Sequence, residues 1–141
     1  MFRIVKNLVA PWPASIRIVK ADGAVEEQRF TLHFRRISNA RFEELFNTMN
    51  FPDSRTQDSK IMEAVVAGWD GIVGEDGEPL PDTPENRRFL LDFPGFGPAL
   101  GVAYARFHMA QPEEREKNSE PSPGGGPAAA GRPVLSSSQN G

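Results

Sequence analysis

The feature that most constrains the fold is a strict alternation over residues 28–35. Phe30, Leu32 and Phe34 share one side of an extended chain, and basic or polar residues occupy the positions between them. Side chains of a β-strand point alternately to its two faces, so this pattern predicts a strand with one buried face. The opposite face stays in water, as is common in antiparallel sheets.

A partner strand is predicted immediately before it. Residues 16–20 are rich in β-branched side chains, and Asp22-Gly23, a strong signal for a hairpin turn, follows them. Residues 2–5 are a candidate for a third strand. Pro11-Trp12-Pro13 must form a loop or a sheet edge, because proline has no N–H to donate to a β-ladder.

About four short helices are predicted after the strands, from capping signals and from apolar residues three or four positions apart. The expected helix starts are Ser38 or Asn39, Asp58 or Ser59, Thr83 followed by Pro84, and Pro98. The expected stops are Pro52, Gly68 and residues 94–98. The apolar stripe of the last helix is Leu100, Ala103, Tyr104 and Phe107.

These elements predict an α+β fold for residues 1–111: an antiparallel β-hairpin or small sheet, then about four short helices. Residues 112–141 differ in composition, with no aromatic residue and only Val134 and Leu135 as large aliphatics. Such a segment buries too little apolar surface to offset the entropy lost on ordering. We therefore predict a disordered tail rich in proline, glycine and serine.

The composition narrows the class of protein. There is no cysteine, which excludes disulfides, thiolate metal sites and thiol nucleophiles. No secretory signal is visible after Met1, and no apolar run approaches the ~20 residues of a membrane span. The sequence therefore predicts a protein of a reducing cytosol that does not interact with membranes.

Charge is distributed unevenly along the chain. Residues 1–41 carry eight Lys or Arg against three Asp or Glu, whereas residues 42–111 carry five against twelve. Either the two parts pack on one another, or they leave a polarised surface through which copies self-associate head to tail or grip a charged partner. Nucleic acid is not an expected partner, since the basic residues form no stripe and the pI is 5.4.

No sequence signature of catalysis, cofactor binding or metal binding is present. In the acidic stretch at 70–79, placing Gly77 at the glycine position of a calcium loop puts Ile72, Gly74 and Thr83 where oxygen ligands are needed. Gly95-Phe96-Gly97 has the wrong spacing for a dinucleotide fingerprint. His33 and His108 are isolated. We therefore expect a protein that is not an enzyme and has no cofactor.

Gly68-Trp69-Asp70-Gly71 is the most distinctive local feature. A tryptophan between flexible glycines is costly to leave in water. Either the Trp69 ring covers the end of the second helix and seals the core, or it anchors an interface, since tryptophan is enriched at binding hot spots.

The order of these features resembles the tail assembly chaperones of long-tailed, siphophage-like bacteriophages and prophages. The resemblance covers roughly Val25 to Ala110 and follows the basic hairpin. Its motifs are Phe42-Glu43-Glu44-Leu45, residues 65–71 (VVAGWDG), residues 76–81 (DGEPLP), residues 83–86 (TPEN) and Ala103-Tyr104.

The resemblance implies a function and partners. Members of that family bind the aggregation-prone tape measure protein, keep it soluble, and help to deliver tail tube subunits in the host bacterial cytoplasm. They are absent from the finished virion. The alternative is a structural protein of the virion, such as a minor tail or connector component.

The resemblance also implies a programmed frameshift, because many members are made in two lengths and the longer extension is thought to recruit the major tail tube protein. The codons GAA AAA AAC for Glu116-Lys117-Asn118 would contain a slippery heptamer. Gly124-Gly125-Gly126 is a second place to examine in the gene.

Protein binding would require apolar side chains that remain unburied. The candidates are aromatic and methionine residues of the predicted helix stripes together with the tryptophan: Trp69, Phe42, Phe46, Met49, Met62, Phe96 and Phe107. For each, plain core packing is the competing interpretation.

Overall fold

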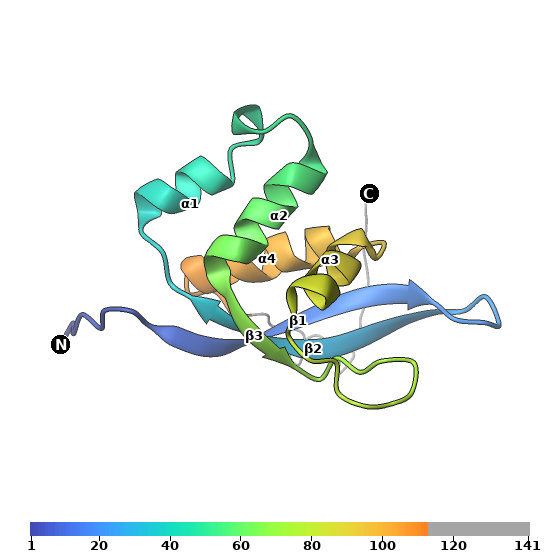
Figure 1. The fold of residues 1–141 in the computed structure, drawn as a ribbon. Coiled ribbons are helices and arrows are strands. Elements are labelled where there is room, and N and C mark those ends of the chain that lie inside the picture. The colour runs from blue at the N-terminus through green and yellow to red at the C-terminus, as the bar shows by residue number, and fades with distance from the viewer. Residues whose placement is uncertain (113–141) are drawn as a thin grey trace, which may run out of the picture. The chain divides into compact units, whose positions relative to one another are not determined.

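The structure is a computed structural model that describes residues 1–112 (Figure 1). Its elements are β1 (Val9–Val19), β2 (Val25–Arg35), α1 (Asn39–Leu45), the 3₁₀ helix η1 (Thr48–Asn50), α2 (Ser54–Val65), β3 (Val66–Asp70), α3 (Pro84–Asp92) and α4 (Phe96–His108). The predicted α+β class is confirmed. The predicted tail, apart from Pro112, lies outside the described residues.

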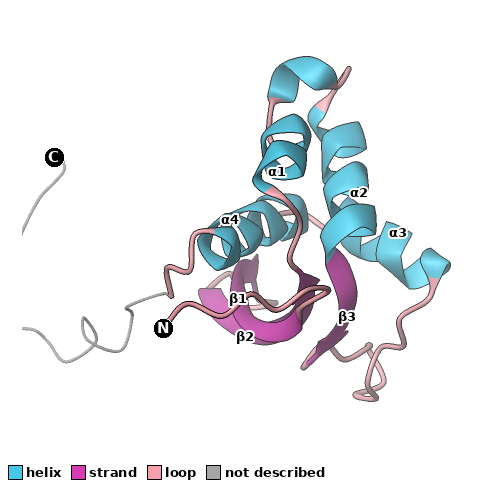
Figure 2. Cartoon of the chain, turned by 90° about the vertical axis from the view of Figure 1, so that its left-hand side faces the viewer, coloured by secondary structure: helices cyan, strands magenta, loops and turns pink. Residues whose placement is uncertain are grey.

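The three strands form one antiparallel sheet in the order β1-β2-β3. The helices lie on one side of it, as Figures 1 and 2 show from two directions. Phe30, Leu32 and Phe34 are buried, whereas His33 and Arg35 lie on the alternate positions and stay partly or fully exposed. The alternation in the sequence therefore identified the face of β2 that the helices cover.

The hairpin turn is also where the sequence places it. Gly23 has a φ of +87°, a conformation that glycine adopts without strain, and the Asp22 carboxylate accepts a hydrogen bond from the Ala24 N–H at 2.9 Å. Pro11 and Pro13 lie inside β1, which is an edge strand of the sheet. The edge alternative for these prolines is the correct one.

The third strand is not the one predicted. Residues 2–5 form no strand; instead Val66–Asp70 pairs with β2, placing Gly68 opposite His33 and Trp69 opposite Leu32. The expectation that Gly68 merely ends a helix was therefore wrong. α2 ends at Val65, and pairing with residues more than thirty positions away converts the next residues into a strand.

The end of α1 and the start of α2 also differ from prediction. Ser38 does cap α1, accepting from the Arg41 N–H at 3.1 Å, but α1 ends at Leu45 rather than at Pro52, and η1 follows. α2 begins at Ser54, earlier than the predicted Asp58 or Ser59. Its start is fixed by Asp53, whose carboxylate accepts from the Thr56 N–H at 2.7 Å and whose pKa is lowered by that hydrogen bond.

The last two helices have contrasting starts. Thr83 caps α3 as predicted, since its hydroxyl accepts from the Asn86 N–H at 3.0 Å and Pro84 occupies the first turn. α4 begins at Phe96, two residues before the predicted Pro98, after a left-handed Gly95 with a φ of +90°. Pro98 is tolerated because the first turn has no intrahelical acceptor for its missing N–H.

The core lies between the covered face of the sheet and the helices, and Tyr104 is at its centre. Its ring packs edge-on against Phe34, with ring centroids 5.1 Å apart, and its hydroxyl accepts from the Ile37 N–H at 3.1 Å. The buried apolar residues are Ala14, Phe30, Leu32, Phe34, Leu45, Ile61, Met62, Val65, Val66, Trp69, Leu90, Phe96, Leu100, Ala103 and Tyr104. Within residues 1–112, none of the helices combines the length and apolarity that a membrane crossing requires.

Candidate functional site

An apolar groove of about 330 Å³ lies between the hairpin, the loop that follows β3, and α3. Phe30 and Phe96 form its floor, with their rings stacked at a centroid distance of 5.9 Å. Ile16 and Ile18 of β1 contribute a half-buried wall. The groove is thus built on the packed core of the domain.

α3 and its C-cap supply two accessible apolar side chains of the groove. Phe89 is 60% exposed and Phe93 is 39% exposed, and the two lie four residues apart, on one side of α3 and its C-cap. Leu90 points inward and is buried, which fixes the rotation of the helix. Two adjacent, exposed phenylalanines on an apolar groove are typical of a binding surface rather than of a monomer's surface.

The loop over residues 71–82 forms the third wall. The Leu80 N–H donates to the Ile72 carbonyl at 2.9 Å, and Val73 pairs with Pro79 in an isolated β-bridge. Gly71, with a φ of +82°, allows the chain to turn close to the Phe30 backbone. The loop is therefore folded on itself, and it holds Val73, 58% exposed, at the groove.

Trp69 ties this loop to the core. Its ring is buried, and its Nε1 donates to the Leu80 carbonyl at 2.9 Å. The Arg87 guanidinium lies 5.9 Å from the ring centroid and donates to both carboxylate oxygens of Asp82, at 2.6 and 2.8 Å. This hydrogen bonding lowers the pKa of Asp82 and raises that of Arg87. Trp69 therefore lies in the core and covers its edge, which is the first of the two interpretations of this residue.

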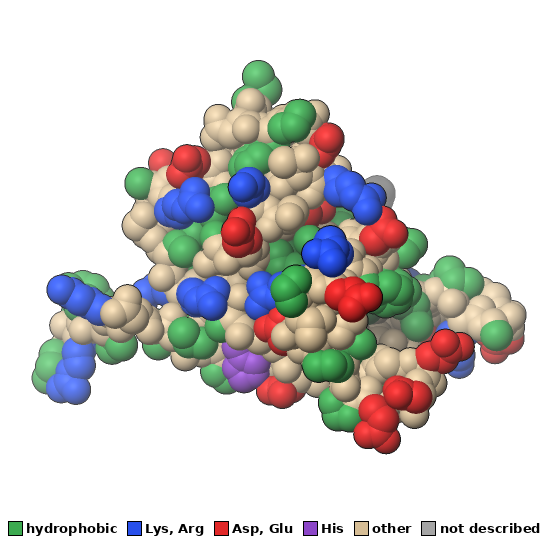
Figure 3. Space-filling model, viewed as in Figure 1, with side chains coloured by type: hydrophobic (Ala, Val, Ile, Leu, Met, Phe, Trp, Pro, Cys, Tyr) green, Lys and Arg blue, Asp and Glu red, His purple; other side chains and the backbone are tan. Residues whose placement is uncertain are grey.

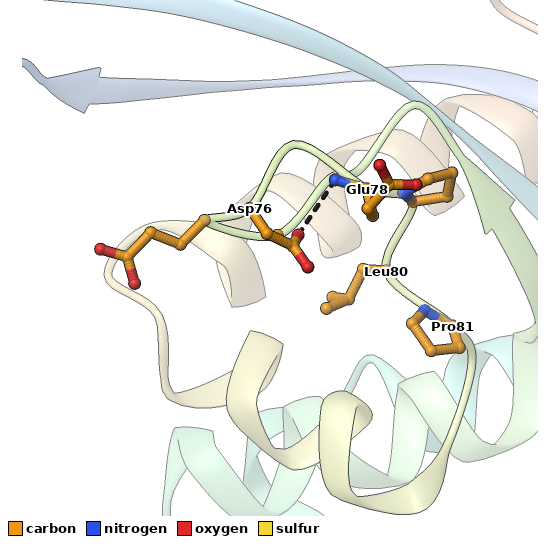
Figure 4. A pocket seen from close by; sticks show the side chains of 7 residues that line it. Asp76, Glu78, Leu80 and Pro81 are labelled. Carbon is orange, nitrogen blue, oxygen red and sulfur yellow. Dashed lines mark hydrogen bonds between the residues drawn. The ribbon is translucent and has the colours of Figure 1, made fainter.

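The tip of the loop is acidic. Glu75, Asp76 and Glu78 are exposed, and the Asp76 carboxylate accepts from the Glu78 N–H at 3.0 Å (Figure 4). None of the three forms an ion pair within the described part of the chain. Residues 1–112 contain no cluster of three or more His, Cys, Asp or Glu side chains suited to a metal ion.

The predicted binding residues do not gather on one surface. Trp69, Met62 and Phe96 are buried in the core, and of these three only Phe96 lines the groove. Phe42, Phe46 and Phe107 are half-buried and pack against the core. Phe42 stacks on Phe46 and on His108, with centroids 4.4 and 4.1 Å apart. Met49 is 87% exposed, on η1.

Sequence reasoning missed the groove itself. Its accessible residues, Phe89, Phe93 and Val73, are not among the binding residues that the sequence predicts. Phe89 and Leu90 are adjacent, and adjacent helix positions can both be buried, as Ile61 and Met62 are in α2. The sequence alone does not reveal which of the two points outward.

The two histidines lie apart. His33 contacts Asp70 across the uncovered face of the sheet, at 2.7 Å from Nε2 to Oδ2. His108 lies at the end of α4, with Nε2 at 3.1 Å from the Asn39 side-chain oxygen, and burial lowers its pKa. Neither histidine lines the groove.

Comparisons with protein-family models, with curated proteins and with solved structures found no match.

Proposed function

We propose that this chain is a phage tail assembly chaperone, which binds and solubilises the tape measure protein and helps to recruit tail tube subunits. It acts by binding rather than by catalysis. The observation that supports the proposal is that residues 65–86, which carry most of the resemblance, form the end of α2, β3, the acidic loop and the start of α3. Two of the three groove walls, the loop and α3, are built from or supported by these segments.

The groove suits an amphipathic partner helix. Such helices place apolar side chains three or four residues apart into a preformed apolar groove. Covering a large side chain such as Phe89 or Phe93 contributes about 1.5–3 kcal/mol at full burial. The Trp69–Leu80 hydrogen bond and the Arg87–Asp82 pair hold the loop in place before binding, which reduces the entropy lost on association.

Co-expression with the tape measure protein tests the proposal. We expect the chain to keep that protein in the soluble fraction, and Phe89→Ser with Phe93→Ser to abolish the effect. Val102→Ser is the matched control, because Val102 is also exposed, at 58%, but lies on α4 and does not line the groove. Equal solubility of the tape measure protein with and without the chain would contradict the chaperone function.

The proposed location is the host bacterial cytoplasm, with no copies in the mature virion. The competing function is a structural minor tail or connector component. Mass spectrometry of purified particles separates the two, since only the structural component is expected to persist in stoichiometric amounts.

Recruitment of the tail tube protein would require the frameshifted extension. Glu116-Lys117-Asn118 and Gly124-Gly125-Gly126 lie outside the described residues. The gene sequence provides the test: non-slippery codons at both places would rule out this route to the extension.

A further inference from the structure

The rim of the apolar groove carries mainly negative charge. Glu75 lines the groove, and Asp76 and Glu78 follow it on the loop between β3 and α3. All three side chains are exposed. Figure 3 shows red side chains gathered at this loop, at the lower right of the view, with green ones beside them. Acidic side chains therefore border the apolar groove on the side of the loop.

A fourth acid lies on the same helix as the exposed phenylalanine of the groove. Glu85 is exposed in the first turn of α3, four residues before Phe89, and residues with this spacing lie on one side of a helix. Among residues 1–112, none of the four acids takes part in an ion pair. Their charges are therefore available to a partner.

Few cations offset these acids. Arg29 is the one cation that lines the groove in the part of the chain that the structure describes. On α3, Arg87 donates to the Asp82 carboxylate at 2.6 Å, and Arg88 lines a separate depression beside α2. The groove and its rim therefore carry a net negative charge.

The loop holds its acids in a defined shape. The Gly74 N–H donates to the Glu78 carbonyl at 2.8 Å, and the Gly77 N–H donates to the Gly74 carbonyl at 2.9 Å. Gly77 has a φ of +81°, which a glycine adopts without strain. Because the Trp69 hydrogen bond also closes the base of the loop, a partner meets these charges already in position, and less entropy is lost on binding.

An apolar groove with an acidic rim fits a partner of matching chemistry. Its volume of about 330 Å³ is near the lower end of the ~300–1,000 Å³ of small-molecule pockets, so it suits a few inserted side chains. An amphipathic helix supplies such side chains three or four residues apart. Cations beside that apolar stripe would meet the acids of the rim, whereas anions would be repelled.

We propose that the groove selects a basic amphipathic helix, with lysine or arginine beside its apolar stripe, and rejects an acidic helix of the same shape. This rests on the proposed function, since it names the class of segment that the chaperone binds in the tape measure protein. The apolar groove provides the contact area, and the rim decides which helices are accepted.

Fluorescence anisotropy with three labelled synthetic peptides tests the selection. Each is an amphipathic helix of about 20 residues with the same leucine stripe, and the flanking positions are all lysine, all glutamine or all glutamate. These three residues have similar helix propensities, so the peptides differ mainly in charge. The lysine peptide should bind at least roughly tenfold more tightly than the glutamate peptide at low salt, and added salt should reduce the difference.

A charge variant of the loop connects the selection to the rim. Glu75→Gln, Asp76→Asn and Glu78→Gln together remove three negative charges, and the asparagine oxygen can still accept from the N–H of residue 78. This triple variant should bind the lysine peptide roughly tenfold more weakly and the glutamine peptide as before.

The matched control removes the same charge elsewhere. Glu43→Gln, Glu44→Gln and Glu63→Gln lie on α1 and α2 and do not line the groove, so this triple variant should bind all three peptides like the unmodified chain. Phe89→Ser with Phe93→Ser should lose binding of every peptide. Circular dichroism checks that each variant is folded.

Several results would overturn the proposal. They are failure of the lysine peptide to bind, equal binding of the lysine and glutamate peptides, or an unchanged affinity of the loop variant for the lysine peptide. Equal binding of a lysine peptide with a central proline would assign the groove to an extended segment. Loss of peptide binding as the chain is concentrated would assign it to a second copy. A tape measure protein that stays soluble with the chain would still support the chaperone function in each case.

Discussion

The indole Nε1 of Trp69 donates a hydrogen bond to the carbonyl oxygen of Leu80 at 2.9 Å, across 11 residues of sequence. Those residues contain the acidic loop, so the bond closes the loop at its base. Trp69 is part of the sheet, where it pairs with Leu32. Leu80, at the other end of the hydrogen bond, lines the groove. Core packing and the shape of the groove are thereby linked.

Trp69→Phe should therefore affect both stability and the loop. The variant loses the hydrogen bond, worth about 0.5–1.5 kcal/mol, and part of a buried ring, so we expect the free energy of unfolding to fall by about 1–3 kcal/mol. Urea denaturation measures the loss. Hydrogen exchange at the Gly74 and Leu80 amides should also accelerate, and unchanged exchange there would show that the indole does not hold the loop.

Gly97→Ala should destabilise the protein, although alanine usually favours helices by up to about 1 kcal/mol over glycine. A Cβ at Gly97 would lie 2.1 Å from the Asp58 carboxylate oxygen and 2.8 Å from its Cγ. Both atoms belong to the end of the Asp58 side chain, which must turn aside, so we expect a loss of about 0.5–1.5 kcal/mol in urea denaturation.

Two further variants make the Gly97 prediction specific. In an Asp58→Ala background, Gly97→Ala should be neutral or stabilising, because the clashing carboxylate is gone. Gly101→Ala is the control on the same helix, where the nearest heavy atom lies 4.0 Å away, and it should stabilise by up to about 1 kcal/mol. Equal losses at Gly97 and Gly101 would contradict the steric explanation.

His108 should make stability depend on pH in mildly acidic solution. Burial lowers its pKa in the folded state below the ordinary value near 6.5, so the unfolded chain binds its proton first as the pH falls. Its contribution to stability is complete above about pH 6.5 and declines as the pH falls from there to the folded pKa.

The measurement for this prediction is thermal unfolding at a series of pH values. The decline below about pH 6.5 should be smaller in His108→Gln, which has no imidazole to protonate. A decline of the same size in the variant would show that other groups cause it.

Thr83→Ala should lower stability by about 1 kcal/mol, because it removes the hydroxyl that accepts from the Asn86 N–H. Since α3 carries Phe89, binding in the groove should weaken as well. Thr83→Ser keeps the accepting oxygen and should retain most of the stability in chemical denaturation. If the serine variant were as unstable as the alanine variant, the cap would not be the cause.

Local signals in the sequence predicted much of the fold. Asp22-Gly23 at the hairpin, Ser38 before α1 and Thr83 before α3 each act on backbone groups two or three residues away, so sequence neighbours determine them. The alternation around Leu32 likewise identified the buried face of β2.

The features that were missed depend on contacts distant in sequence. Val66 continues the apolar pattern of α2, and only its pairing with Phe34 turns the chain into a strand there. In the same way, Phe89 and Leu90 have similar hydrophobicity, and the packing around α3 decides that Leu90 is buried and Phe89 exposed. Propensity and periodicity carry no information about such choices.

Proline at two positions of β1 determines what the outer edge of the sheet can join. Pro11 and Pro13 lie opposite His33 and Thr31, and neither has an N–H to offer on the free side of the strand. An incoming strand would meet two missing donors within three residues, which interrupts any continuous ladder and protects the edge against fibril-like growth. A protein that binds at this edge must therefore do so through side chains rather than by extending the sheet.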